Sequence, residues 1–262
     1  MERIKPRFFA IVGTQRSGTT VLRSIIDTHP KVKAFGEVFI PSDAHIKENY
    51  YHYLRKRVIE SPRLCIPTIE HTRELFKGYL VYLAELTDAE VILFDCKYEF
   101  LRGVGNMGSV KLDNPPYLLN LFNSLGVETI HLTRENVLKM HVSTILTVQT
   151  LVWATEHPEL MPNRTVHVAL NSLKQELQTL QSHQKRWSND LSGLSLKYED
   201  LFVDDAMSDK VLDQVAQALG LDAEFNPTPR FKKIGLPLHQ AIQNYSEVQE
   251  LLGDTPFKKF LE

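Results

Sequence analysis

The sequence has few cysteines and no long apolar segment. Two of its 262 residues are cysteines, which is too few for a disulfide framework or a cysteine-rich zinc site, and we predict no metal site. No stretch reaches the roughly 18 uninterrupted apolar residues of a membrane span. Segment 1–9 is charged and lacks the apolar core of a signal peptide. These deficits predict a cytoplasmic protein in a reducing compartment.

The chain also lacks an excess of charge of either sign. Thirty Lys and Arg residues stand against 32 Asp and Glu residues, and the formal net charge is −2. A nearly neutral protein has no overall attraction to nucleic acid or to anionic membranes, so we predict neither as a partner. The hydrophobic content of 43% is enough for one substantial core. We therefore expect a single domain over residues 1–262, and no pattern indicates its oligomeric state.

Short apolar segments alternate with segments of helical periodicity. The apolar segments predict strands at 8–13, 32–35, 90–95, 127–133 and 194–198. The periodic segments predict helices at 20–29, 43–60, 68–87, 115–125, 135–157, 171–191, 208–219 and 239–251. Strands that alternate with helices form a parallel sheet with helices on both faces. The sequence therefore predicts an α/β fold with three layers.

The segment FFAIVGTQRSGTT, residues 8–20, is an apolar strand that runs into a loop between two glycines and then into a helix. Gly13 and Gly18 have the spacing of a nucleotide-binding P-loop, but Thr19 stands where that loop carries the lysine for the β and γ phosphates. Backbone N–H groups and the positive end of the following helix suit one terminal phosphate. We assign its contacts to Arg16, Ser17, Gly18, Thr19 and Thr20.

Four segments of the chain resemble, in order, the sulfotransferases that use 3′-phosphoadenosine 5′-phosphosulfate (PAPS). They are GTQRSGTTVLRSIIDTHPKVKAFGEVF, HLTREN, LKYEDL and IQNYSEVQELLGDTPFKKFL. The first is similar to the 5′-phosphosulfate loop, especially that of bacterial and tyrosylprotein sulfotransferases. The resemblance implies a P-loop-like sulfotransferase fold and PAPS as the sulfuryl donor, with 3′-phosphoadenosine 5′-phosphate (PAP) as its product. It also implies that no metal is required and that the acceptor is a hydroxyl group.

Arg134 and Ser143 are the candidates for a second phosphate contact. Arg134 follows an apolar strand, at the edge where ligands of open α/β sheets collect, and a guanidinium group suits bidentate binding of phosphate. HLTREN with Ser143 resembles the family's 3′-phosphate element, although the family separates the two residues by eight positions and this chain by nine. In the alternative interpretation Arg134 pairs with Glu135, and Ser143 faces a neighbouring element.

The resemblance implies two further contacts with the nucleotide. Tyr198, in LKYEDL, matches the family tyrosine that contacts adenine. Lys232 and Lys233 lie where related enzymes carry a basic loop that closes over the 3′-phosphate. The alternatives are a half-buried strand tyrosine and a solvated pair of lysines.

Glu37 is the candidate general base. An ungapped match from RSGTT places it on the glutamate that serves as base in tyrosylprotein sulfotransferases, and a well-placed base contributes about 10²–10⁴-fold to a rate. Lys97 matches the family's lysine near the transferred group, and Arg16 is the cation of the loop. The alternatives are a solvated or ion-paired carboxylate and two surface cations. If Glu37 is not the base, the next candidates are His29, His45 and His52.

The acceptor pocket is expected between the helices of segment 43–87 and the glycine-rich loop 102–116. Tyrosylprotein sulfotransferases carry a glutamate and then an arginine beyond the catalytic glutamate, whereas this chain has Val38 and Phe39. The difference argues against a protein tyrosine and favours a saccharide, a lipid or another small molecule as the acceptor.

Two other classes of function remain open. One is a P-loop kinase or NTPase, since VILFD resembles an apolar strand that ends in a magnesium-binding aspartate, Asp95. The absent P-loop lysine argues against this class. The other is a non-catalytic nucleotide-binding protein on the same scaffold, and the joint presence of Glu37, Lys97 and Arg16 argues against it.

Overall fold

The computed structural model describes residues 6–66, 68–101, 117–161, 164–204, 206–231 and 235–261. Its centre is a sheet of five parallel strands in the order β2-β3-β1-β4-β5. The strands are β1 (Arg7–Gly13), β2 (Val32–Glu37), β3 (Val91–Lys97), β4 (Val127–Thr133) and β5 (Leu194–Lys197). The five predicted strands are confirmed, with ends that differ by at most two residues.

Helices connect the strands and cover both faces of the sheet. They are α1 (Thr19–Ile26), α2 (Tyr50–Glu60), α3 (Ile69–Glu85), α4 (Tyr98–Leu101), α5 (Tyr117–Leu125), α6 (Val137–Thr150), α7 (Leu170–Asp190), α8 (Asp209–Leu219), α9 (Leu238–Ala241) and α10 (Tyr245–Leu252). A short hairpin of β6 (Phe202–Val203) and β7 (Ala206–Met207) precedes α8. Within the described residues, none of these helices has the length and apolar character needed to cross a membrane.

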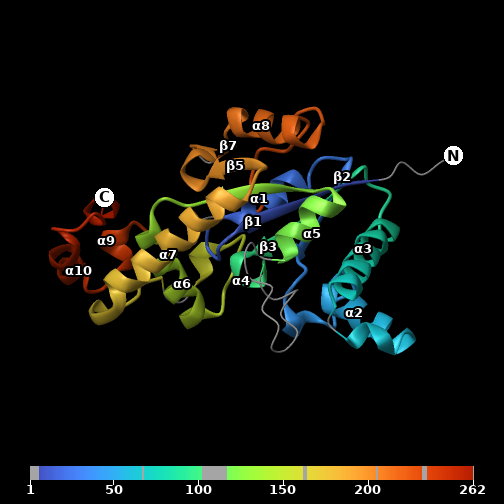
Figure 1. Cartoon of the computed structure of the whole chain (residues 1–262). Helices are drawn as coiled ribbons and strands as arrows, with labels where there is room; N and C mark the ends of the chain where they lie inside the picture. The colour runs from blue at the N-terminus through green and yellow to red at the C-terminus, as the bar shows by residue number, and fades with distance from the viewer. Residues whose placement is uncertain are drawn as a thin grey trace.

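Alternate residues of the central strands point to opposite faces of the sheet. In β1, Ala10 and Val12 pack in the cluster that includes α3 and α5, whereas Phe9 and Ile11 pack in the cluster that includes α1 and α8. Figure 1 accordingly shows α8 on one side of the sheet and α5 on the other. Both faces are covered, as is usual for a parallel sheet. The predicted three-layer α/β fold is confirmed.

A third apolar cluster joins α6, α7, α9 and α10 (Figure 1). The long helix α7 contributes to two clusters, because Leu173 and Leu177 are buried in this third cluster and Trp187 is buried in the cluster with α3 and α5. The apolar periodicity of segment 171–191 thus corresponds to a buried helix face. Helix α7 therefore packs both against the carboxyl-terminal helices and against the helices that cover the sheet.

Two predicted helices are shorter in the structure than their periodicity indicated. The helix predicted at 43–60 begins only at Tyr50, because the Asn49 side chain accepts the N–H of Tyr51 and caps the helix there. The helix predicted at 135–157 ends at Thr150, because Leu151 adopts a left-handed backbone with φ of 57°. Residues 151–157 therefore leave the helix and are free to approach the phosphate loop.

The helix predicted at 239–251 is interrupted between α9 and α10. Asn244 lies in the interruption. Its side-chain Oδ1 accepts the N–H of Val168 at 3.0 Å, and its Nδ2 donates to the Val168 carbonyl at 3.0 Å. This tertiary contact takes the place of the continuous helix that the periodicity indicated.

Candidate active site

The loop between β1 and α1 is closed by short-range contacts. The Ser17 hydroxyl is buried and donates to the Thr14 carbonyl at 2.7 Å. A Cβ on Gly13 would lie 2.8 Å from that hydroxyl, so the close turn depends on the absence of a side chain at Gly13. The Ser17 side chain thus shapes the loop from inside and does not line the cavity described below.

The helix that follows this loop presents free donors. Gly18 caps α1 with a left-handed backbone, φ of 97°, and makes no side-chain cap. The first turn of α1 carries no acidic residue, so its N–H groups and the positive end of the helix dipole have no local anion. This terminus is suited to bind a phosphate or sulfate group.

A cavity of about 410 Å³ opens in front of the loop. Residues from the loop, β2, β3, β4, α6 and the end of β5 converge on it, as expected for the carboxyl edge of a parallel sheet. The predicted site residues among its lining are Arg16, Gly18, Thr19, Thr20, Glu37, Lys97, Arg134, Ser143 and Tyr198. Residues predicted to share one site from distant parts of the sequence are thus brought together.

Arg16, Arg134 and Ser143 form one connected group in the lining of the cavity. The Arg16 Nε donates to the Ser143 Oγ at 2.9 Å, and an Arg134 Nη donates to the backbone carbonyl of Arg16 at 2.9 Å. The Arg134 guanidinium also lies 4.2 Å from the centre of the Tyr198 ring. The alternative pairing of Arg134 with Glu135 is not seen, because Glu135 bonds the Lys197 ammonium at 2.7 Å.

Neither arginine forms an ion pair with a carboxylate in the described part of the chain, and the charges of Glu37 on Arg16 and of Glu199 on Arg134 act only at longer range. Burial lowers the pKa of Arg16, and the adjacent charge of Arg134 lowers it further. Burial likewise lowers the pKa of Arg134, whose buried Nε has no hydrogen-bond acceptor. Guanidinium groups nevertheless stay protonated in proteins. A buried and a half-buried cation that lie next to each other, with an orphaned donor on Arg134, form a site that an anion would stabilise.

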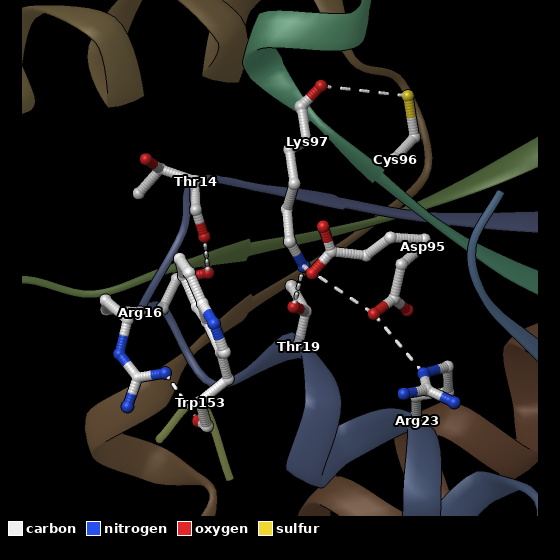
Figure 2. A network of polar contacts seen from close by, with 10 residues as sticks. Thr14, Arg16, Thr19, Arg23, Asp95, Cys96, Lys97 and Trp153 are labelled. Carbon is white, nitrogen blue, oxygen red and sulfur yellow. Dashed lines mark hydrogen bonds and ion pairs between the residues drawn. The ribbon is translucent and has the colours of Figure 1, made fainter. Parts of the chain in front are cut away.

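Lys97 and Glu37 also line the cavity and stand at the ends of β3 and β2; Figure 2 shows Lys97 reaching toward Thr19. The Lys97 ammonium donates to the Thr19 hydroxyl and lies 3.4 Å from a Glu37 carboxylate oxygen. Lys97 is only 2% exposed, so it is not the surface cation of the alternative interpretation. An irregular register between Ala34 and Glu37 separates β2 from its regular pairing with β3, and bulges of this kind re-aim side chains near functional sites.

Asp95 lies beneath Lys97 and does not open onto the cavity. One of its carboxylate oxygens is 3.3 Å from the Arg23 Nε and 3.6 Å from the Lys97 ammonium (Figure 2). Its charge is thus matched by two protein cations, in contrast to the exposed aspartate of a magnesium site. The described residues contain no group of three or more metal-ligating side chains suited to hold an ion.

Several cavity residues were not predicted from the sequence. Trp153 is the most informative, because its carbonyl accepts from an Arg16 Nη at 2.7 Å and its side chain lies beside the phosphate loop in Figure 2. The periodicity had placed Trp153 on a helix, which hid this contact. The other unpredicted residues include Gln15, Asp43, Lys139, Leu146, Phe231 and Leu236.

Other predicted features do not meet at the cavity. Val38 and Phe39 are buried in the core, and the ring centres of Phe39 and Phe94 lie 5.7 Å apart. Neither side chain is therefore available to an acceptor. The histidines proposed as replacement bases do not line the cavity; they are His29, His45 and His52. Lys232, Lys233 and the loop 102–116 lie outside the described residues.

Comparison with known proteins agrees with this geometry. The model of the sulfotransferase family matches residues 6–225, which is well over half of the chain and includes the phosphate loop, all three catalytic candidates and the Arg134 segment. A search of the curated proteins returned no match. The matched range and the α/β fold support sulfuryl transfer as the general chemistry. The chain belongs to the sulfotransferase family.

Proposed function

We propose that the protein transfers the sulfuryl group of PAPS to a hydroxyl group of a saccharide, a lipid or another small molecule. One observation carries the proposal. A half-buried arginine, Arg16, and a buried one, Arg134, form no ion pair with a carboxylate among the described residues, and both line the same cavity as a helix terminus whose loop lacks the P-loop lysine. This pattern suits a ligand with two separate anionic groups and not the single polyphosphate chain of ATP.

The donor is assigned to residues by charge and position. We place its 5′-phosphosulfate on the backbone N–H groups of the loop and on the Thr19 and Thr20 hydroxyls. Its 3′-phosphate goes to Arg134 and Ser143, where the orphaned Nε of Arg134 supplies a donor. Tyr198 is placed against the adenine. We further propose that Lys232 and Lys233 close over the 3′-phosphate.

Sulfuryl transfer requires a base and a cation at the same place. In the proposed reaction Glu37 takes the proton of the acceptor hydroxyl, whose oxygen forms a bond to sulfur while the bond from sulfur to the 5′-phosphate oxygen breaks. The electron pair of that bond leaves with the 5′-phosphate of PAP. Lys97 and Arg16 stabilise the charge on the sulfuryl and bridging oxygens. The distance of 3.4 Å between Lys97 and Glu37 supports this pairing of roles.

The acceptor is proposed to bind beside Glu37, in the part of the cavity that the donor leaves open. Ile40 and Asp43 follow Glu37 in the chain and also line the cavity. We assign to them the first contacts with the acceptor, in place of Val38 and Phe39.

An acceptor screen tests the proposal. The purified protein is incubated with PAPS carrying a labelled sulfuryl group and with separate pools of sugars, lipids and phenols. We expect transfer of label into one pool by the native protein and not by the Glu37→Gln variant. Tight PAP binding without transfer to any pool would support the non-catalytic alternative, and transfer of phosphate from ATP would support the kinase alternative.

A further inference from the structure

Asp95 is a buried carboxylate to which the proposed reaction gives no role. Its side chain is closed off from solvent, and one carboxylate oxygen contacts both the Arg23 Nε and the Lys97 ammonium. Its second oxygen has no hydrogen-bond partner among the described residues. Burying a carboxylate is unfavourable unless its charge is paired and its oxygens accept hydrogen bonds. Asp95 therefore requires an explanation beyond packing.

The position of Asp95 relates it directly to Glu37. The two residues are paired across β2 and β3 at the irregular register, and both carboxylates lie within 3.6 Å of the same Lys97 ammonium. Glu37 faces the cavity, whereas Asp95 does not. Lys97 is thus shared between one carboxylate that a substrate can reach and one that it cannot.

This sharing matters when Glu37 changes its charge. A base that accepts a proton becomes neutral and stops balancing the ammonium beside it. A buried ammonium group without a counter-ion is strongly disfavoured, so with Glu37 as its sole counter-ion Lys97 would not be held in position at the moment when the sulfuryl group requires it. Asp95 does not line the cavity, so the substrate cannot reach it, and it keeps its contacts with Arg23 and Lys97 when Glu37 takes the proton.

We propose that Asp95 is a positioning residue that acts as the permanent counter-ion of Lys97, an inference that rests on the proposed sulfuryl transfer. It holds the ammonium between Thr19 and Glu37 before, during and after proton transfer. Arg23 lies on α1 and binds the same carboxylate. The helix that carries the phosphate loop and the lysine at the end of β3 therefore share one anchor.

The first test separates binding from turnover. Asp95→Asn removes one negative charge close to a site for anions, so PAP binding measured by calorimetry should be unchanged or tighter. Turnover with the acceptor from the screen should fall on the order of 10-fold to 100-fold, because a misplaced group loses that much. A merely structural role would weaken PAP binding and turnover together. That result would overturn the inference.

A double-mutant cycle with Lys97→Met provides the second test. If Asp95 acts through Lys97, Asp95→Asn has no further effect on turnover once Lys97 is absent. The double variant removes both charges of a buried pair at once, so it tolerates folding better than a variant that leaves one charge alone. A lower turnover of the double variant than of Lys97→Met alone would contradict the inference, and this comparison remains possible even if the single Asp95→Asn variant fails to fold.

A matched control breaks a different ion pair. Arg7→Gln removes the 2.6 Å pair with Glu128, which does not line the cavity, and should leave PAP binding and turnover unchanged. Different results would contradict the proposed sulfuryl transfer and the proposed role of Asp95. A native protein that does not bind PAP contradicts the proposed function, whereas one that binds PAP and shows additive losses contradicts only the role of Asp95.

Discussion

The ring of Tyr198 packs so closely on Gly18 that a Cβ placed on Gly18 would lie 2.5 Å from the ring carbon Cδ2. The guanidinium of Arg134 lies 4.2 Å from the centre of the same ring. Tyr198 is therefore held between the phosphate loop and Arg134, the residue that follows β4. This arrangement links the two proposed phosphate subsites through one aromatic side chain, and it explains why glycine occupies position 18.

Gly18→Ala should destabilise the protein. The substitution places a Cβ against Tyr198 and puts a non-glycine residue at φ of 97°, which by itself costs about 1–2 kcal/mol. Urea unfolding should show at least this loss, and calorimetry should show weaker PAP binding. Gly36→Ala is the matched control for stability, since a Cβ there has no atom within 4 Å and the backbone has no positive φ. Equal midpoints for the two variants would contradict the account.

Arg134→Ala should separate the two phosphate subsites. It removes a charge-assisted contact of about 1.5–3 kcal/mol from PAP but not from the analogue that lacks the 3′-phosphate. Calorimetry with both ligands measures the difference. Arg57→Ala removes an exposed arginine that is paired with Glu60 and should change neither affinity. Equal losses for both ligands on Arg134→Ala would assign this arginine a structural role only.

Glu37→Gln should abolish catalysis and preserve donor binding. The amide keeps the shape of the side chain and loses its basicity, so turnover should fall by about 10²-fold or more. PAP affinity and the unfolding midpoint should remain close to those of the native protein. Transfer at the native rate would remove Glu37 from the mechanism, and a joint loss of stability and activity would mark it as structural.

His131 should make the fold sensitive to mild acid. Burial lowers its pKa to about 4, below the value near 6.5 expected in the unfolded chain. As pH falls below 6.5 the unfolded chain takes up the proton first, so the stabilisation present at neutral pH is lost progressively down to pH 4. The expected loss from this residue between pH 7 and pH 5 is about 2 kcal/mol.

Urea unfolding at several pH values checks this expectation. His131→Gln keeps a polar partner for the Tyr98 hydroxyl, which lies 2.6 Å from His131 Nε2. The variant should lose less of its free energy of unfolding between pH 7 and pH 5 than the native protein does. Parallel pH profiles of the two proteins would show that His131 does not titrate in this range.

The strands and the phosphate loop were predictable because their signals are local. Apolar runs such as 91–94 indicate a strand by composition alone, and Gly13 and Gly18 mark a turn that few other residues permit. The convergence of Glu37 and Arg134 on one cavity followed from their places at the carboxyl ends of parallel strands.

The missed features depend on contacts between distant segments. The end of α6 at Thr150 follows from a left-handed Leu151 that periodicity does not reveal, and Trp153 reaches the cavity only because of that break. The burial of Phe39 depends on aromatic residues of other elements. Likewise, the sharing of Lys97 by two carboxylates appears only when β2 and β3 are aligned at their irregular register.

Calorimetric titration of the native protein with PAP tests the central claim most directly. The account predicts that PAP binds in a buffer that contains a magnesium chelator, and that it binds more tightly than AMP, which lacks the 3′-phosphate, or ATP with magnesium. The orphaned Arg134 donor and the loop without a lysine both require this order of affinities. Preferential, magnesium-dependent binding of ATP would contradict the account and favour a kinase.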